Sequence, residues 1–338
     1  MLPREEFYVR ERQTLSPYAM LCEHTRGREV PIPESDMRTE YMRDRDRIIH
    51  SKAFRRLKDK TQVFIDPTGS HYRTRLTHTL EVAQISRTIA RCLALNEDLT
   101  EAAALGHDLG HAPFGHAGEA AITAFFREHG RAEPFQHNVQ SLRVVDVLEN
   151  GTGLNLTFEV RDAIVNHKKD CTPATLEGMA VNFADRIAYL NHDIDDAVRA
   201  GILTEDQLPP FAMDVLGRGH SERIDTMIRD IVRQSEGQPF VRQSPEVAAA
   251  TNELRAYMFS EVYLGGKAKE EEKKVQDVIF LLMAHYLAHP EELPETERKN
   301  LPRDGDLVCA ADYVSGMTDK FAVMKFQELF VPRGWALL

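Results

Sequence analysis

The stretch ALGHDLGHAPFGHAGE, residues 104–119, decides how the rest of the chain is interpreted. It contains three histidines, one aspartate and one glutamate among glycines and a proline, residues that interrupt a helix. Imidazole and carboxylate groups bind divalent metals and also transfer protons. The stretch therefore predicts a pocket with metal or acid–base chemistry at a helix end. On these residues alone the alternative is a chance cluster, because an adjacent His-Asp pair is common.

Apolar residues recur at helical spacing on both sides of this stretch, and alternating patterns are scarce. Thr100 is the predicted N-cap of LTEAAALGHDLG, and Thr172-Pro173 is predicted to open a long helix that continues through residues 181–200. Ser244-Pro245 is predicted to open another helix. Only residues 61–67 (TQVFIDP) suggest a strand. We predict an all-α fold with one continuous core, divided into an N-terminal extension (1–37), a core region (38–240) and a C-terminal helical portion (241–338) packed on it.

Composition limits the classes of protein that remain. The 338 residues carry a net charge of −11, which disfavours a chain that coats nucleic acid or an anionic membrane. The four cysteines lie far apart with no CxxC pair, as expected for free thiols in a reducing compartment. The charged N-terminus does not resemble a signal peptide, and the longest apolar run, VIFLLMA at 278–284, is too short to span a bilayer. These features predict a cytoplasmic protein with no membrane partner.

Candidate metal ligands come from three predicted helices: His78, the pair His107-Asp108, and Asp185. Ligands on separate helices suit a site in the middle of a helix bundle. Asp185 shares one face of its predicted helix with Tyr189 and Asp193, because residues four apart are neighbours on a helix. The alternative for that face is a solvated polar stripe. His116 and Glu119 are three apart, so the carboxylate can orient the imidazole and raise its pKa.

The order His78, His107-Asp108, Asp185 resembles the H…HD…D pattern of HD-domain metal-dependent phosphohydrolases. More narrowly, the chain is similar to bacterial deoxyguanosine-triphosphate triphosphohydrolase-like proteins in six segments between residues 38 and 335. These segments are RDRDRIIHSKAFRRLKDKTQVF, HYRTRLTHTLEVAQISRTIA, LGHDLGHAPFGHAGE, FQHNVQSLRV, ADRIAYLNHDIDDA and MTDKFAVMKFQELFVPRGW. The resemblance implies an HD-domain helical bundle with additional C-terminal helices.

The resemblance also implies a role for each matching position. It implies one divalent ion (Mg, Mn, Fe, Co, Ni or Zn) on His78, His107, Asp108 and Asp185. It implies His116, Glu119 and His137 as catalytic residues. Substrate-binding positions would be Arg75 and His111 for phosphate, Tyr189 and Asp193 for deoxyribose, and Gln62 near its 3′-hydroxyl.

The activity implied is hydrolysis of a dNTP, either dGTP or several dNTPs, to deoxynucleoside and tripolyphosphate. Water would attack the α-phosphorus, with His116 or His137 as the general acid. Alternatives are another HD-domain phosphohydrolase, such as a nucleotidase or phosphodiesterase, or a non-catalytic binding protein. The resemblance further suggests a homo-oligomer, with a hexamer as the expected form, and a second dNTP as an allosteric effector. The acidic balance gives no indication of nucleic acid as a partner.

Overall fold

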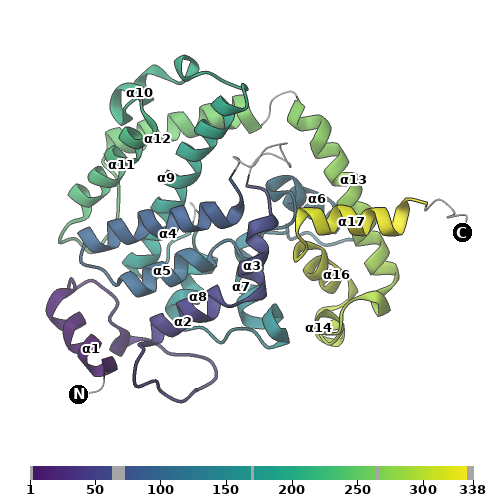
Figure 1. The fold of residues 1–338 in the computed structure, drawn as a ribbon, viewed down its shortest axis with the longest axis horizontal. Coiled ribbons are helices and arrows are strands. Elements are labelled where there is room, and N and C mark those ends of the chain that lie inside the picture. Colours follow the sequence, from purple (N-terminus) through teal and green to yellow (C-terminus); the bar gives the residue numbers. More distant parts are fainter. Residues whose placement is uncertain (1–2, 63–72, 169–170, 264–266, 333–338) are drawn as a thin grey trace, which may run out of the picture.

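The computed structural model describes residues 3–62, 73–168, 171–263 and 267–332, and most of these residues are helical (Figure 1). Among the described residues no strand occurs, and β pairing is limited to two isolated bridges, Arg28 with Thr157 and Thr61 with Thr74. The prediction of an all-α fold is confirmed. Most of the predicted strand at 61–67 lies outside the described residues.

Short 3₁₀ and π turns connect several of the α-helices. The α-helices of the described residues are α1 (Pro3–Thr14), α2 (Glu40–Ile49), α3 (Lys52–Arg56), α4 (Arg75–Cys92), α5 (Glu97–Gly106), α6 (Gly115–Glu128), α7 (His137–Arg143), α8 (Phe158–Val165), α9 (Leu176–Arg199), α10 (Pro210–Leu216), α11 (His220–Ser235), α12 (Pro245–Met258), α13 (Lys267–Ala288), α14 (Glu295–Arg298), α15 (Leu301–Asp304), α16 (Asp306–Ser315) and α17 (Asp319–Phe330).

Two of the predicted helix starts are wrong. The N-cap of α5 is Asn96, whose side chain accepts a hydrogen bond from the Leu99 amide at 3.2 Å, while the Thr100 hydroxyl donates back to the Asn96 carbonyl inside the helix. The N-cap of α9 is Thr175, so Pro173 precedes the helix. In both cases a polar side chain other than the predicted one caps the first turn, Asn96 in α5 and Thr175 in α9. The start of α12 is confirmed, with Ser244 as N-cap and Pro245 first.

The first hydrophobic core surrounds α4, α5 and α9. Helix α4 packs against both α5 and α9, and α5 also packs against α2 and α8. Figure 1 shows α4 crossing α9, with α5 beside α4 and with α10, α11 and α12 beyond α9. Because α4, α5 and α9 are in mutual contact, polar side chains in the first turn of α4, at the end of α5 and in the middle of α9 are brought to one place.

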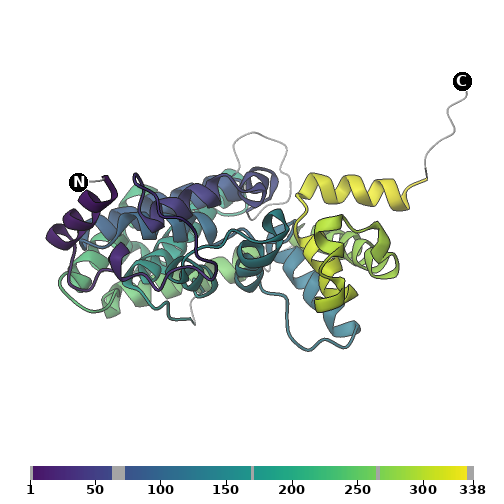
Figure 2. The same cartoon turned by 90° about the horizontal axis from the view of Figure 1, so that it is seen from below.

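A second cluster of buried apolar residues forms where α6 packs against α13 and α16. The prediction of one continuous core is therefore wrong. Helix α6 lies far from α13 in sequence, but the two bury a shared apolar face, including Ile122, Phe125, Ile279 and Leu282. Figure 2 shows these C-terminal helices at the end of the molecule opposite α1. No described helix is long and apolar enough to cross a membrane.

Candidate metal centre and active site

Four predicted metal ligands meet where α4, α5 and α9 adjoin. His78 lies on α4, His107 caps the C-terminus of α5, Asp108 follows it, and Asp185 lies on α9. His78 Nε2 is 3.1 Å from Asp185 Oδ1, and His107 Nε2 is 3.3 Å from Asp108 Oδ1 and 3.8 Å from Asp185 Oδ1. The two histidines and Asp108 are buried. The structure thus brings the four side chains together.

Glycines allow the turn after α5 to pass close to α7. A Cβ on Gly110 would lie 2.1 Å from the Ser141 amide nitrogen, so no side chain fits at this position. The Ser141 hydroxyl accepts from the Gly110 amide and donates to the His107 carbonyl. Farther on, Gly115 begins α6 at a φ of +60°, a conformation that favours glycine. Helix α5 therefore ends at His107, and the hydrogen bonds of Ser141 hold the following turn against α7.

The quartet fits a divalent cation. Nδ1 of His107 lies 2.7 Å from the Ala104 carbonyl, which only accepts, so this nitrogen carries the proton. Nε2 of His107 then has a free lone pair. This nitrogen is buried, faces two carboxylates and has no hydrogen-bond partner among the described residues. With metal–ligand bonds of about 2.0–2.2 Å, neighbouring ligand atoms lie about 2.8–3.1 Å apart in an octahedral site and about 3.3–3.6 Å apart in a tetrahedral one, and the observed 3.1 and 3.3 Å fall in these ranges.

Both carboxylates of the quartet favour their ionised form. Burial alone would raise the pKa of Asp108, but His107, His111 and Arg75 hold it well below its usual range. Burial likewise opposes ionisation of Asp185, and the hydrogen bond with His78 and the nearby His107 lower the Asp185 pKa to about 2. Two ionised carboxylates in a largely buried place need a compensating positive charge, which a cation supplies.

Arg75 and His111, which the resemblance implies as phosphate-binding residues, lie beside the metal-ligand quartet. Arg75 is buried, and its Nη1 donates to Asp108 Oδ2 at 2.8 Å. Its Nη2 reaches the Gln62 carbonyl, while its Nε and the Gln62 side-chain oxygen have no partner among the described residues. His111 Nε2 lies 3.4 Å from Asp108 Oδ1, and burial together with Arg75 lowers the His111 pKa. Arg75 thus contacts one oxygen of the Asp108 carboxylate, and His111 lies beside the other.

The three predicted catalytic residues form one group around Glu119. Nδ1 of His137 lies 2.9 Å from Glu119 Oε2, and Nδ1 of His116 lies 3.5 Å from the same oxygen. Burial would raise the Glu119 pKa, but the two histidines hold it well below its usual range. His137 is buried, whereas 75% of the His116 side chain is exposed. This group borders a hollow of about 510 Å³ lined by His116, Glu119, Ala120, Thr123, Arg127, Phe135, His137 and Lys168.

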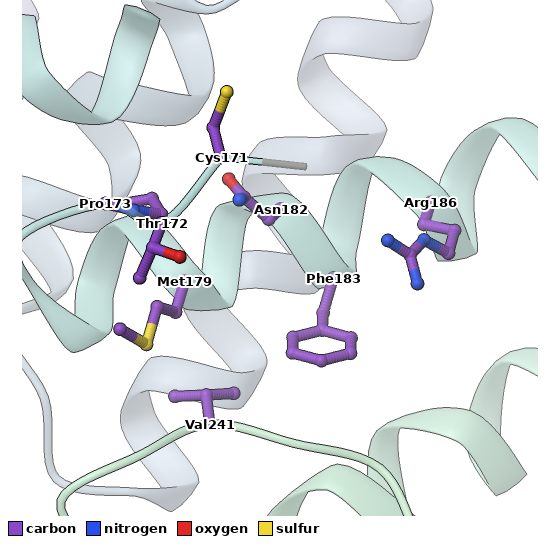
Figure 3. Close-up of a pocket in the computed structure, with 8 residues that line it drawn as sticks. All are labelled: Cys171, Thr172, Pro173, Met179, Asn182, Phe183, Arg186 and Val241. Carbon is purple, nitrogen blue, oxygen red and sulfur yellow. The ribbon is translucent and has the colours of Figure 1, made fainter. Parts of the chain in front are cut away.

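The predicted polar face of α9 is not a solvated stripe. Asp193 is buried, and Tyr189 is half-buried against the first core, where burial raises its pKa to about 12. Tyr189 and Asp193 follow Asp185 one and two turns along the helix. Another pocket, of about 220 Å³, borders α9, with Arg186 at one end (Figure 3).

Known proteins match the chain over nearly its whole length. A model of the HD domain matches residues 75–190, and one of the phosphohydrolase-associated domain matches residues 241–328. A protein of Caldanaerobacter subterraneus subsp. tengcongensis named deoxyguanosinetriphosphate triphosphohydrolase-like protein is 52% identical over 326 residues, which cover 96% of this chain and 95% of that protein. The chain belongs to the deoxyguanosinetriphosphate triphosphohydrolase-like family. A Clostridium tetani protein of the same name is 46% identical over 335 residues, again covering 96% and 95%.

Membership of the deoxyguanosinetriphosphate triphosphohydrolase-like family makes the chain an HD-domain phosphohydrolase with side chains that can hold a divalent ion. A solved phosphohydrolase from Bacteroides thetaiotaomicron has the same fold, with a TM-score of 0.52 at 16% identity over 90% of this chain and 71% of that one. The likeness to that structure concerns the fold alone.

Sequence reasoning missed three buried polar residues of this family member. His167, after α8, lies with its Nε2 3.2 Å from His137 Nε2. The buried Lys60 amine donates to the His111 and Ser315 carbonyls, and burial lowers its pKa to about 7. Asp319, at the start of α17, accepts from the amides of Thr61 and Phe114. Each makes contacts across a long stretch of chain, which no local pattern in the sequence reveals.

Asp319 is expected to stabilise the turn that carries His111 and His116. The Asp319 carboxylate accepts hydrogen bonds from two backbone amides, each at 2.9 Å, and the residue is only 7% exposed. Asp319→Ala would leave both amides unsatisfied and lower the free energy of unfolding by about 2–4 kcal/mol, because hydrogen bonds to charged groups contribute about 1.5–3 kcal/mol each. Urea unfolding measures this, with the exposed Asp306→Ala as control. Equal losses in the two variants would contradict the assignment.

Proposed function

We propose that this HD-domain phosphohydrolase is a dNTP triphosphohydrolase that converts dGTP, or several dNTPs, to deoxynucleoside and tripolyphosphate. The observation that carries the proposal is the convergence of His78, His107, Asp108 and Asp185 next to a second group built on Glu119. The names of the curated relatives support the substrate class. A homo-oligomer, a hexamer by resemblance, and a dNTP effector stay predictions.

A divalent ion held by the quartet would activate water and offset phosphate charge. Around it, the chain's own groups supply positioning. The Arg75 guanidinium, with its Nε lacking a partner among the described residues, offers a donor to phosphate oxygens without leaving Asp108. His111 lies beside the other oxygen of Asp108. These contacts would hold the α-phosphorus beside the attacking water and direct the β- and γ-phosphates toward positive groups.

The 5′-oxygen of the sugar is a poor leaving group as an alkoxide and needs a proton. His116 is mostly exposed at the hollow and lies next to the ionised Glu119, so it can carry a proton and give it to an incoming ligand. His137 is the alternative donor, but its ring is buried and its Nδ1 is bonded to Glu119. Tyr189 and Asp193 would contact the deoxyribose, and Gln62 would approach its 3′-hydroxyl.

Product analysis tests this reaction against other HD phosphohydrolases. Phosphorus NMR and chromatography of a dGTP digest with Mn²⁺ should give deoxyguanosine and tripolyphosphate in equal amounts, without early dGMP or dGDP. In oxygen-18 water, the label should appear on a terminal phosphate of tripolyphosphate, because attack at the α-phosphorus breaks its bond to the 5′-oxygen. A dGMP first product would indicate a pyrophosphatase, dGDP with orthophosphate a γ-phosphatase, and label in deoxyguanosine attack at carbon. Each of these results would overturn the proposal.

A further inference from the structure

The His78 imidazole needs an acceptor for its proton when it acts as a metal ligand. Its Nε2 faces Asp185 at 3.1 Å and would offer its lone pair to the cation. A neutral imidazole carries one N–H, so the proton of a metal-bound His78 lies on Nδ1. Nδ1 is buried and has no hydrogen-bond partner among the described residues, whereas Nδ1 of His107 donates to the Ala104 carbonyl. Because a buried donor without an acceptor is costly, His78 needs a partner too.

Glu81 follows His78 by one turn of α4 and offers a buried oxygen. Its Oε2 has no hydrogen-bond partner among the described residues, and one Glu81 oxygen lies within 4.8 Å of a ring nitrogen of His78. Residues three apart are neighbours on a helix, so both side chains lie on the same face of α4. Since Nε2 of His78 faces Asp185, Nδ1 is the nitrogen left to meet the Glu81 carboxylate. An unused acceptor therefore lies near the unused donor.

Arg73 holds the other oxygen of Glu81. Its Nε donates to Glu81 Oε1 at 3.1 Å, and its Nη1 donates to Asp195 and Asp196 on α9 at 3.1 and 2.9 Å. Burial would raise the pKa of Glu81, but His192 and Arg73 hold it below its usual value. The Glu81 carboxylate is therefore ionised and anchored between α4 and α9, with Oε2 left to accept a further hydrogen bond.

His192 faces the same Glu81 oxygen from α9. Its Nδ1 lies 2.8 Å from Glu81 Oε2, at an angle that makes no hydrogen bond, and is buried without a partner among the described residues. One nitrogen each of His78 and His192 and one oxygen of Glu81 lie within 4.8 Å of one another. A carboxylate oxygen has two lone pairs and can accept from both rings. One small rearrangement around Glu81 would thus satisfy three buried polar atoms together.

We propose that Glu81 is the positioning residue of His78. With a divalent cation at the quartet, Glu81 Oε2 accepts the Nδ1 proton of His78 and a second hydrogen bond from His192. The bond to His78 keeps the Nε2 lone pair directed at the ion and raises the basicity of that nitrogen. Glu81 acts on the ion only through His78. The inference rests on the metal-ligand quartet of the proposed function and not on its substrate.

Metal affinity tests the inference without reference to activity. The full chain is stripped with a chelator and titrated with Mn²⁺, and electron paramagnetic resonance measures the free ion. The ion that His107→Ala no longer binds is the ion of the quartet. Glu81→Met keeps the length of the side chain but removes both acceptors, and we expect the affinity for that ion to fall about 10–100-fold. Glu81→Gln keeps an oxygen that accepts, so its loss should be smaller.

Glu97→Met is the matched control. The side chains of Glu97 and Glu81 are each 32% exposed, and Glu97 also pairs with an arginine, Arg91, at 2.8 Å. Glu97 belongs to no group of described residues that could hold a metal, so Mn²⁺ affinity should stay unchanged. Proton NMR of the Zn²⁺-loaded chain adds a direct readout. A downfield imidazole N–H signal that His78→Gln removes should also be absent in Glu81→Met.

Several outcomes would overturn the role of Glu81. Equal Mn²⁺ affinities in Glu81→Met and Glu97→Met would do so. Equal losses in the Met and Gln variants with the downfield signal retained would mean that Glu81 acts only through the packing of Arg73. If Glu81→Met unfolds, as circular dichroism would show, Glu81→Gln replaces it, and unchanged affinity with an unshifted signal would refute the inference.

The same preparations separate this inference from the proposed function. Unchanged affinity in Glu81→Met, together with tripolyphosphate release by the unaltered chain, would refute the role of Glu81 and leave the proposed function intact. Weakened affinity in Glu81→Met, with no nucleotide hydrolysis by the unaltered chain, would do the reverse.

Discussion

Replacing His107 with alanine is expected to abolish metal binding at the quartet and phosphohydrolase activity together. His107 is fully buried, and its Nε2 has no hydrogen-bond partner among the described residues and faces Asp108 and Asp185. Without His107 the quartet has only three ligands, two of them ionised carboxylates. The divalent ion that would activate water is then no longer held. Mass spectrometry of bound Mn²⁺ and a product assay on the same sample measure both effects.

The control for this variant must distinguish loss of a ligand from loss of the fold. Deleting the buried ring leaves a cavity, so circular dichroism and urea unfolding accompany the assay. His107→Gln fills more of the space and is expected to lose activity equally. His129→Ala, at the C-cap of α6 and in no group of described residues that could hold a metal, should keep both metal and activity. Full turnover by a metal-free His107→Ala protein would show that the quartet is not the catalytic metal site.

The helices were predictable because their signals are local. Apolar spacing of three and four residues marks α4, α9 and α12, and Ser244-Pro245 marks the start of α12 at the correct residue. The predicted start of α5 failed within the segment LNEDLT, where Asn96 and Thr100 are both competent caps. Asn96 caps the helix because it also bonds the Met20 carbonyl, a contact with a distant segment. Cap choice there depends on tertiary structure.

The candidate site was predictable where residue type and order carried the information. His78, His107, Asp108 and Asp185 follow a family pattern, and the structure brings them together. The polar groups that support them follow no pattern. Lys60 reaches Ser315 across 255 positions, and Asp319 reaches Phe114 across 205. The second core is of the same kind, since α6 pairs with α13 through apolar residues that each helix alone presents as an ordinary hydrophobic face.

His116→Ala is expected to lower kcat by about 10²–10⁴-fold, the usual contribution of general acid–base catalysis, while bound metal is unchanged. His116 belongs to no group of residues in the described chain that can hold a metal, and its ring lies at the hollow, 3.5 Å from Glu119. The loss should fall on kcat rather than KM, because the proton is needed only as the 5′-oxygen leaves. Steady-state kinetics with dGTP and metal analysis of the same preparations measure the two quantities.

Two further variants test whether the loss in His116→Ala reflects proton transfer by a histidine that Glu119 orients. Glu119→Gln keeps the side chain's shape but removes the carboxylate that orients His116, so a loss of about 10–100-fold is expected, as for residues that orient a reacting group. His289→Ala is the matched control, since His289 is also an exposed histidine 3.3 Å from a glutamate, Glu291, and should leave kcat unchanged. A loss below about threefold in His116→Ala would exclude His116 as the proton donor, since general acids contribute far more. The proton would then have to come from His137, whose Nδ1 proton is held by Glu119 and whose Nε2 faces His167.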